Sequence, residues 1–510
     1  MFRKKVFSYV LVVLLIFNFL PSSQNTVYAA NINHQTSIRL GGTTAANMIS
    51  GPTDIGLSVT TDINGNVIMT GIVFGNADLN GNATSTDGGA ETASSTYTHG
   101  DIFISSFTSS SVFQWSKRLG GTFSTFMAAT SDAGYSVVTD SQGNVIVAGQ
   151  VYGNADLNGD GDSTDGGAET ASSTYGSSTD IFISSFTSTG TFKWTKRLGG
   201  TAGDGATSVI VDQNDNIIVT GHAGVADLNG DGDSNDGAVE QTAYTAQGDV
   251  VISSFTTEGV FQWTKRLGGS NYSGGNSVTT DSNSNVIVTG YVKGDADLNG
   301  NATSTDGGAE TASSTYQNND IFLSSFTSTG TYKWSKRLGG AGADFGLSVT
   351  TDNSNNVIVT GYVVGAADLN GDGDSNDGGT EATSSYAGTS EPFISSFTTE
   401  GVYQWSQRLG AASGAGRSII TDSSDNIIVT GEVSGDADLN GDGSTDSSGA
   451  ESALGYGGND IFVTSFSSAG TFKWSQRLGG SDASGWPAED IGYSVARDAN
   501  DTIYNRASVW

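Results

Sequence analysis

Short apolar segments alternate with polar, glycine-containing turns along most of the chain, and one unit shows the pattern clearly. Residues 134–140 and 144–149 are apolar runs joined by a short turn, and residues 180–186 and 191–198 form a second such pair. Runs of this length, rich in Val, Ile, Thr and Phe and bounded by Gly, Ser and Asn, predict β-strands joined as hairpins. The unit therefore predicts four antiparallel strands, with a long polar loop between the second and the third.

The four strands differ in their predicted burial. Residues 144–149 are apolar at successive positions, which indicates a strand buried on both faces. In the fourth strand, Phe192, Trp194 and Leu198 share one face because side chains alternate along a strand. Lys196 interrupts this face, so we expect the fourth strand to lie partly exposed at an outer edge. The Lys and Arg of its "KRL" sequence are then expected to meet solvent or the acidic loops.

The unit repeats along the chain at intervals of 69 to 79 residues, measured between the leucines of six "RLG" sequences: Leu119, Leu198, Leu267, Leu338, Leu409 and Leu478. Residues 77–97 and 296–316 are identical, which indicates internal duplication. Tryptophans of the fourth strand, such as Trp194, resemble residues that stack on sugars. Their recurrence at one position favours packing between repeats instead.

Four-stranded antiparallel units that repeat six or seven times predict an all-β fold, a seven-bladed β-propeller. Six complete repeats run from residue 56 to residue 480, and a seventh begins within residues 492–510. A bare "SIRLGG" ends at residue 42. We expect residues 31–42 to supply the fourth strand of the last blade, which is then shared between the termini and lacks a third strand.

The repeated sequence resembles that of a known family, the bacterial SBBP (β-propeller) repeat proteins. The matching pattern is "DIFISSF…G…W…LGG", followed by "GxSVxxD…NVIVTG", and it covers nearly all of residues 31–510. The resemblance implies a propeller and secretion, and it implies no particular activity. The last repeat departs from the pattern, because "DANDTIYNRASVW" replaces the second strand and nothing follows it.

The first thirty residues have the order of a secretory signal peptide: Arg3, Lys4 and Lys5, an apolar run over residues 6–20, and small residues at Ala29 and Ala30. We therefore predict a secreted or cell-surface protein that does not insert in the membrane after cleavage. The formal charge of −32 argues against nucleic acid as a partner, because phosphates would be repelled. Without cysteine, disulfides cannot stabilise the chain, so metal or a large core must do so.

Six acidic loops, which begin at Ala77, Ala155, Ala226, Ala296, Ala367 and Ala437, separate the second and third strands of the repeats. Counted from the aspartate after this alanine, four of them offer oxygens at positions 1, 3 and 5 with Gly at 6, like an EF-hand calcium loop. Ligands of this type favour Ca²⁺ over zinc or copper. The candidate ligands are Asp156, Asn158, Asp160, Asp162, Asp165, Asp227, Asn229, Asp231, Asp233, Asp236, Asp368, Asn370, Asp372, Asp374, Asp377, Asp438, Asn440, Asp442 and Asp446.

Two observations qualify the calcium prediction. The glutamate that an EF-hand places at position 12 is missing, since Gly167 stands there, and Glu169 lies further on. The first and fourth loops carry Asn82 and Asn301 at position 5, so we expect them to bind weakly or not at all. The sixth loop also resembles the calcium loops of FG-GAP (integrin-type) propellers. The alternative is that the acidic loops are solvated spacers.

Nothing in the sequence indicates an enzyme, because the three histidines share no repeat position and no pair of acids stands apart from the loops. We therefore predict a monomeric, calcium-stabilised module for binding, adhesion or scaffolding, with a surface glycan or protein as partner. The alternative is a polysaccharide hydrolase or lyase. Three long connections between repeats carry apolar residues that suggest a ligand-binding patch: Met48, Phe123, Phe126, Met127 and Trp486.

Overall fold

A computed structural model describes the following parts of the chain, to which the structural statements below refer: residues 15–17, 40–42, 54–85, 87–92, 100–121, 132–170, 178–241, 248–269, 271–312, 315–316, 318–375, 377–382, 389–445, 449–453, 458–480, 490–498 and 501–508. The predicted ligand-binding residues Met48, Phe123, Phe126, Met127 and Trp486, and Asp446 of the sixth loop, lie outside them.

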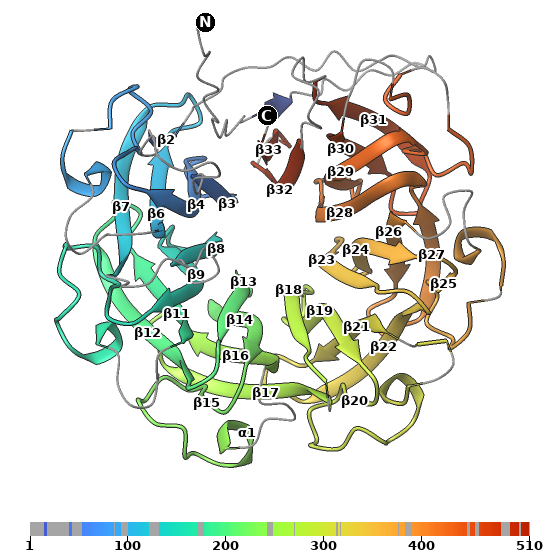
Figure 1. Ribbon diagram of the computed structural model, residues 1–510, viewed down its shortest axis with the longest axis horizontal. Helices are drawn as coiled ribbons and strands as arrows, with labels where there is room; N and C mark the ends of the chain where they lie inside the picture. The colour runs from blue at the N-terminus through green and yellow to red at the C-terminus, as the bar shows by residue number, and fades with distance from the viewer. Residues whose placement is uncertain are drawn as a thin grey trace, which may run out of the picture.

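Six sheets of four long antiparallel strands stand around a central axis as the blades of a β-propeller, and four of them carry a short fifth strand at the outer edge (Figure 1). The first strand of each blade lies nearest the axis and the fourth lies outermost. In chain order the strands are β3 (Ile55–Thr61), β4 (Val67–Phe74), β6 (Gly100–Phe107) and β7 (Phe113–Gly121) in the first blade; β8 (Ala133–Thr139), β9 (Val145–Tyr152), β11 (Thr179–Phe186) and β12 (Phe192–Gly200) in the second; β13 (Gly205–Val211), β14 (Asn216–Ala223), β16 (Asp249–Thr256) and β17 (Phe261–Gly269) in the third.

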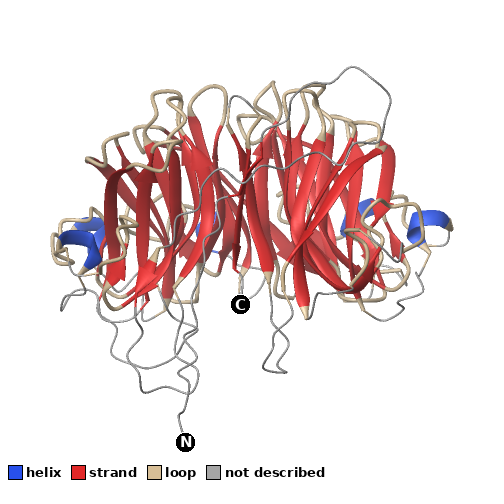
Figure 2. Cartoon of the chain, turned by 90° about the horizontal axis from the view of Figure 1, so that it is seen from above, coloured by secondary structure: helices blue, strands red, loops and turns tan. Residues whose placement is uncertain are grey.

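The remaining blades repeat this order of strands. Their strands are β18 (Gly274–Thr280), β19 (Val286–Lys293), β21 (Asn319–Phe326) and β22 (Tyr332–Gly340) in the fourth; β23 (Phe345–Thr351), β24 (Val357–Val364), β26 (Ser390–Phe397) and β27 (Tyr403–Arg408) in the fifth; β28 (Ala411–Thr421), β29 (Ile427–Ala437), β30 (Asn459–Phe466) and β31 (Phe472–Leu478) in the sixth. Seen from the side, the strands run across the thickness of the ring, and helical residues occur only as single turns in the described loops, such as α1 (Ala238–Gln241) (Figure 2).

The burial of the strands follows the sequence pattern. The second strand β9 is buried at its first five positions, and the third strand β11 at all but its first, as expected for strands between two other blades. The fourth strand β12 is exposed at its start, where Phe192 is 37% exposed, and buried at its end. The all-β propeller fold is therefore confirmed.

The arginine of the "KRL" sequence is buried, so the expectation that it meets solvent is wrong, whereas contact with an acidic loop is found in the third blade, where Arg266 Nε donates to the carbonyl of Val239 at 2.8 Å. Arg197 is 1% exposed and donates from Nε and Nη2 to Oδ2 of Asp180, at 2.9 and 2.6 Å. Asp180 stands on the neighbouring strand β11, so the charge is compensated inside the blade. The neighbouring lysine behaves as expected: Lys196 Nζ donates to the carbonyl of Gly230 in the next acidic loop, at 3.0 Å.

Tryptophans of the fourth strand join successive blades. Trp194 Nε1 donates to the carbonyl of Thr257, in the outer turn of the following blade, at 2.8 Å. Gly259 in that turn lies over the indole, and a Cβ on it would stand 2.9 Å from Trp194 Cδ2. Four more tryptophans make the same bond (Trp115, Trp263, Trp334 and Trp405). Packing between blades, rather than sugar stacking, explains their recurrence.

The last sheet contains β32 (Ile491–Arg497), β33 (Ile503–Ser508) and β1 (Leu15–Phe17). β1 pairs with β33 in the register of a third strand: Phe17 lies opposite Ile503, as Phe466 lies opposite Ile427 in the sixth blade. The sequence predicted no third strand here. Residues 15–17 also fall within the predicted signal peptide, whose cleavage would remove β1.

The N-terminal "RLGG" ends in the position expected for the fourth strand of the last blade. Its β2 (Gly41–Gly42) pairs with β5 (Ala77–Asp78), as the end of β7 pairs with β10 (Ala155–Asp156). Leu40 is 5% exposed and packs in a core cluster with Val59 and Tyr504. Residues 31–39, the remainder of this segment, lie outside the described part of the chain. A complete seventh blade shared between the termini therefore stays a prediction.

Candidate metal loops

Each of the first five acidic loops is anchored on the blade that precedes it. The loop of the second blade begins with β10, whose Ala155 and Asp156 pair with Gly121 and Gly120 at the end of β7. The equivalent short strands are β5 (Ala77–Asp78), β15 (Ala226–Asp227), β20 (Ala296–Asp297) and β25 (Ala367–Asp368). This pairing covers the end of an outer strand and brings the loop to the junction of two blades.

The first aspartate of the loop holds the turn that follows it. Asp156 is fully buried, and its Oδ1 accepts the N–H groups of Asn158 and Gly159, at 3.1 and 2.6 Å. Its Oδ2 accepts the N–H of Gly161 at 2.7 Å. Asp78 makes the corresponding bonds in the first loop. The aspartates at position 1 therefore shape the loop, and cation binding by their oxygens stays a prediction.

Positions 3, 5 and 7 form a series of turns in which each side chain accepts a backbone N–H two residues ahead. Asn158 Oδ1 accepts from Asp160, Asp160 Oδ1 from Asp162, and Asp162 Oδ1 from Thr164, all within 2.9 Å. This conformation leaves these carboxylates at the surface, close enough to solvent to take a cation without a large cost of desolvation.

A glutamate closes each loop at position 14, and the sequence analysis left it out of the ligand set. Glu169 is 3% exposed, and its Oε1 accepts the N–H groups of Leu157 and Asn158, at 3.0 and 3.1 Å. Its Oε2 is buried without a hydrogen-bond partner. Burial raises the pKa of Glu169 to about 7, and the charges of Asp156 and Asp165 add to the rise. The signal was available, since this Glu follows the first aspartate at one spacing in all six loops.

In the fifth blade, the structure brings three of these acids together. One carboxylate oxygen from each of Asp374, Asp377 and Glu381 lies within 4.8 Å of the other two. Glu381 is 3% exposed, and its Oε2 has no hydrogen-bond partner. A buried carboxylate oxygen that faces two other acids is costly unless a proton or a cation joins the group.

The third loop differs from the fifth, because its Glu240 Oε2 accepts the N–H of Asp236 at 3.2 Å. In the third loop, Asn229 Nδ2 donates to Asp236 at 2.7 Å, and the nearby carboxylate of Asp231 raises the pKa of Asp236. In the sixth loop, the backbone N–H of Asn440 donates to Oε1 of Glu451, the glutamate at position 14, at 3.1 Å.

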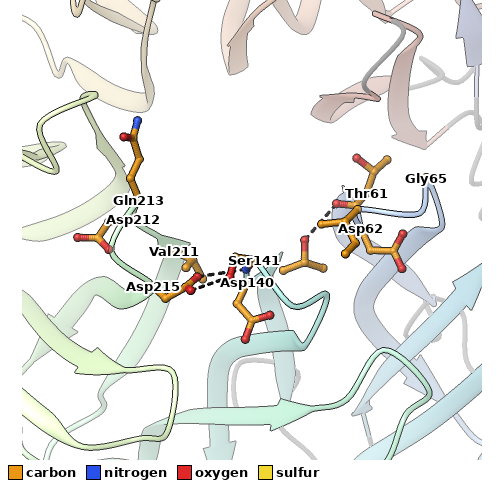
Figure 3. Close-up of a pocket in the computed structure, with 11 residues that line it drawn as sticks. Thr61, Asp62, Gly65, Asp140, Ser141, Val211, Asp212, Gln213 and Asp215 are labelled. Carbon is orange, nitrogen blue, oxygen red and sulfur yellow. Dashed lines mark hydrogen bonds between the residues drawn. The ribbon is translucent and has the colours of Figure 1, made fainter.

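A hollow of about 420 Å³ lies on the opposite face, among the inner turns of the first three blades (Figure 3). Its four aspartates are engaged in holding turns. Asp140, for example, accepts the N–H groups of Gln142 and Asn144, and Asp215 accepts Ser141 Oγ at 2.6 Å. Asp62 and Asp212 each bind two N–H groups of their own turns. None of the four stands out as a catalytic acid or base.

The fold and its loops define a β-propeller repeat protein. Comparison with family models gives a specific match: residues 262–295 match the β-propeller repeat family SBBP, which confirms the resemblance seen in the sequence. An uncharacterized WD repeat-containing protein of Acanthamoeba polyphaga mimivirus is 27% identical over 272 residues, which is 49% of this chain but only 18% of that protein. The chain thus spans a small part of this relative.

Solved structures that resemble this chain in fold have a low sequence identity to it. One is an ulvan lyase from a new family of polysaccharide lyases, with a TM-score of 0.39 and 11% identity, which covers 88% of this chain and 87% of its own. Another is a protein of unknown function from Dyadobacter fermentans, with a TM-score of 0.35 and 9% identity, which covers 75% of this chain and 91% of its own. Similarity at this level carries no information on activity. None of the helices in the described residues is long and apolar enough to span a membrane.

Proposed function

We propose that the protein is an exported β-propeller, stabilised by calcium, that acts as a binding or scaffold module at the cell surface. The observation that carries this proposal is the group formed by Asp374, Asp377 and Glu381, whose oxygens lie within 4.8 Å of one another. Carboxylate oxygens in a flexible loop are the ligands that Ca²⁺ prefers. Calcium is abundant outside cells and would replace the disulfides that this chain cannot form.

A calcium titration followed by thermal melting tests the metal part of the proposal. At 1 mM calcium and a dissociation constant of about 0.1 mM, each site would stabilise the fold by about 1.4 kcal/mol. We expect the melting temperature to rise with calcium and to return when a chelator is added. Equal melting curves with calcium and with chelator would leave the acidic loops as solvated spacers.

The binding part of the proposal concerns a surface glycan or protein, recognised by a monomer. It rests on the apolar residues in the long connections between repeats, with Phe126 and Trp486 as the main candidates. We expect Phe126→Ala and Trp486→Ala to weaken binding to intact cells or isolated envelope polysaccharide while the melting temperature stays constant. Loss of stability in both variants would instead assign these residues to packing.

A further inference from the structure

Five of the six acidic loops fall into two chemical classes, which differ at positions 5 and 7, and the sixth belongs to neither because it has Asp442 and Ser444 there. The first and fourth loops have Asn and Thr there, whereas the second, third and fifth have Asp at both positions. The fold of the loop is otherwise shared: Gly81 and Gly159 donate to their first aspartates at the same 2.6 Å. The two classes therefore share the fold of the loop, and they differ at position 6 as well, where Ala83 and Ala302 replace Gly.

In the first and fourth loops, Asn and Thr donate hydrogen bonds to the aspartate at position 10. Asn301 Nδ2 donates to Asp306 Oδ2 at 2.6 Å, and Thr303 Oγ1 donates to Asp306 Oδ1 at 2.8 Å. These two donors, Asn301 first, lower the pKa of Asp306. Asn82 Nδ2 and Thr84 Oγ1 bind Asp87 in the same way. Each carboxylate oxygen of the aspartate therefore accepts a hydrogen bond from one of these two side chains.

In the second, third and fifth loops, positions 5 and 7 supply no such donor, because an ionised Asp is only an acceptor. The aspartate at position 10 still accepts a hydrogen bond from the Asn at position 3, as from Asn370 Nδ2 to Asp377 Oδ2 at 3.1 Å. In the fifth loop, Asp374 and Asp377 converge with Glu381. Mutual repulsion of these charges favours a cation among them.

A separate observation points to the same place. Oε2 of Glu381 is buried, has no hydrogen-bond partner among the residues that the structure describes, and belongs to a carboxylate with an oxygen within 4.8 Å of an oxygen of each aspartate. Oε2 of Glu310 is also without a partner in the fourth loop. The glutamate alone therefore does not select a cation, and the residues at positions 5 and 7 distinguish the fifth loop from the fourth.

We propose that the second and fifth loops each bind one Ca²⁺ between the carboxylates at positions 5, 7 and 10 and the buried glutamate at position 14. The third loop is left out, because its Glu240 Oε2 accepts the N–H of Asp236 at 3.2 Å. In the first and fourth loops, the amide and hydroxyl donors occupy the place of the cation, so these loops keep the same fold without metal. This inference rests on the proposed function and adds to it a ligand, the glutamate, and a rule for which loops are metal sites.

Exchanging the two classes tests the rule. The triple variant Asn301→Asp, Ala302→Gly and Thr303→Asp gives residues 297–310 the sequence of residues 156–169. Calorimetric titration with calcium chloride should then show one more ion bound per chain than in the wild type. The reverse exchange in the fifth loop, Asp372→Asn with Gly373→Ala and Asp374→Thr, should show one fewer. The first of these sequences already occurs in the fold, and the second differs from the fourth loop only at Asn376 and Thr380, so both variants are expected to fold, which thermal melting checks.

A matched pair of variants tests the glutamate. Glu381→Gln should remove the ion of the fifth loop, whereas Glu310→Gln should leave the number of bound ions unchanged. If the wild type binds calcium but neither exchange alters the number of ions, the rule is wrong and the proposed function stands. If Glu310→Gln loses an ion as Glu381→Gln does, the amide-containing loops are metal sites, which also overturns the rule. If the wild type and the triple variant both bind no calcium, the proposed function fails as well.

Discussion

Thr61 Oγ1 donates a hydrogen bond to the carbonyl of Arg497, 3.2 Å away and 436 residues later in the chain. Thr139 Oγ1 makes the same kind of bond to Thr61 O, and Thr421 Oγ1 to Thr351 O, between adjacent inner strands. β3 is therefore the neighbour of β32, and the two ends of the repeat array meet at one seam (Figure 1). The inner strands surround the axis without a gap between the first sheet and the last.

The buried Leu40 makes the seam testable. Leu40→Ala should lower the free energy of unfolding by about 2–4 kcal/mol, because it leaves a cavity next to Val59 and Tyr504. Leu119→Ala, at the equivalent position of a complete blade, serves as the reference. Chemical denaturation measures both. If Leu40→Ala is neutral while Leu119→Ala is costly, the N-terminal segment does not contribute to the core.

The contact between tryptophan and glycine should be sensitive to a single methyl group. Gly259→Ala would place a Cβ 2.9 Å from Trp194 Cδ2 at a residue with φ of +77°. Gly65 has a similar φ of +74° but no atom within 4 Å of the added Cβ, so Gly65→Ala reports the backbone strain alone. We expect Gly259→Ala to be less stable than Gly65→Ala by about 1–3 kcal/mol. Equal melting temperatures would show that the indole moves away without cost.

Removal of one partner of a buried ion pair should be costly. Arg197→Met leaves Asp180 buried without its counter-charge, and we expect a loss of about 3–5 kcal/mol. Lys193→Met breaks the contact with Glu258, which is 3.7 Å long and exposed, and should cost no more than about 1 kcal/mol. Urea unfolding curves give the free energy of unfolding of the wild type and of each variant. A small effect at Arg197 would mean that water or a proton compensates Asp180.

Stability should decrease as pH rises from 5 to 8. Burial raises the pKa of Asp132 and of Asp204 to about 7, while an unfolded aspartate titrates near 3.9. The folded state therefore holds these protons more tightly, and their contribution is complete below pH about 4 and lost as pH rises through 7. The melting temperature, measured from pH 5 to pH 8 in the presence of a chelator, gives this pH dependence without a contribution from calcium.

The fourth blade supplies the control for this pH dependence, because Ser273 occupies the equivalent position and is also buried. Asp132→Ser combined with Asp204→Ser should flatten the slope of melting temperature against pH. Glu258→Gln removes an exposed charge and should leave the slope unchanged. An unchanged slope in the serine variant would assign the dependence to other acids.

The repeating part of the fold was readable from the sequence because it depends on local patterns. The strand positions and the buried second strand follow from the pattern of apolar residues, and the partly exposed fourth strand follows from Lys196, which interrupts its apolar face. Six copies of one pattern reduced the uncertainty that a single copy would leave. The pairing of β1 with β33 could not be predicted, since it joins residues from opposite ends of the chain and has no repeat to support it.

Charged residues were harder to place, because hydrophobic periodicity assigns them to the surface by default. Arg197 is buried because Asp180, 17 residues earlier, stands beside it on the next strand. The same spacing recurs in every complete repeat and was the available signal. Glu169 was noted but left out of the ligand set for a similar reason. The EF-hand spacing directed attention to position 12, whereas the glutamate of this loop binds the start of the loop from position 14.

The short alanine-aspartate strands have a consequence for how such a chain can grow or shrink. Each acidic loop belongs to one blade by sequence but pairs with the outer strand of the blade before it, as β10 does with β7. In a single excised repeat, the end of the outer strand would therefore lack its pairing strand. A repeat inserted between two others would pair with the outer strand before it and with the short strand after it. Gene duplication can add a whole unit without any new interface, in keeping with the identical residues 77–97 and 296–316.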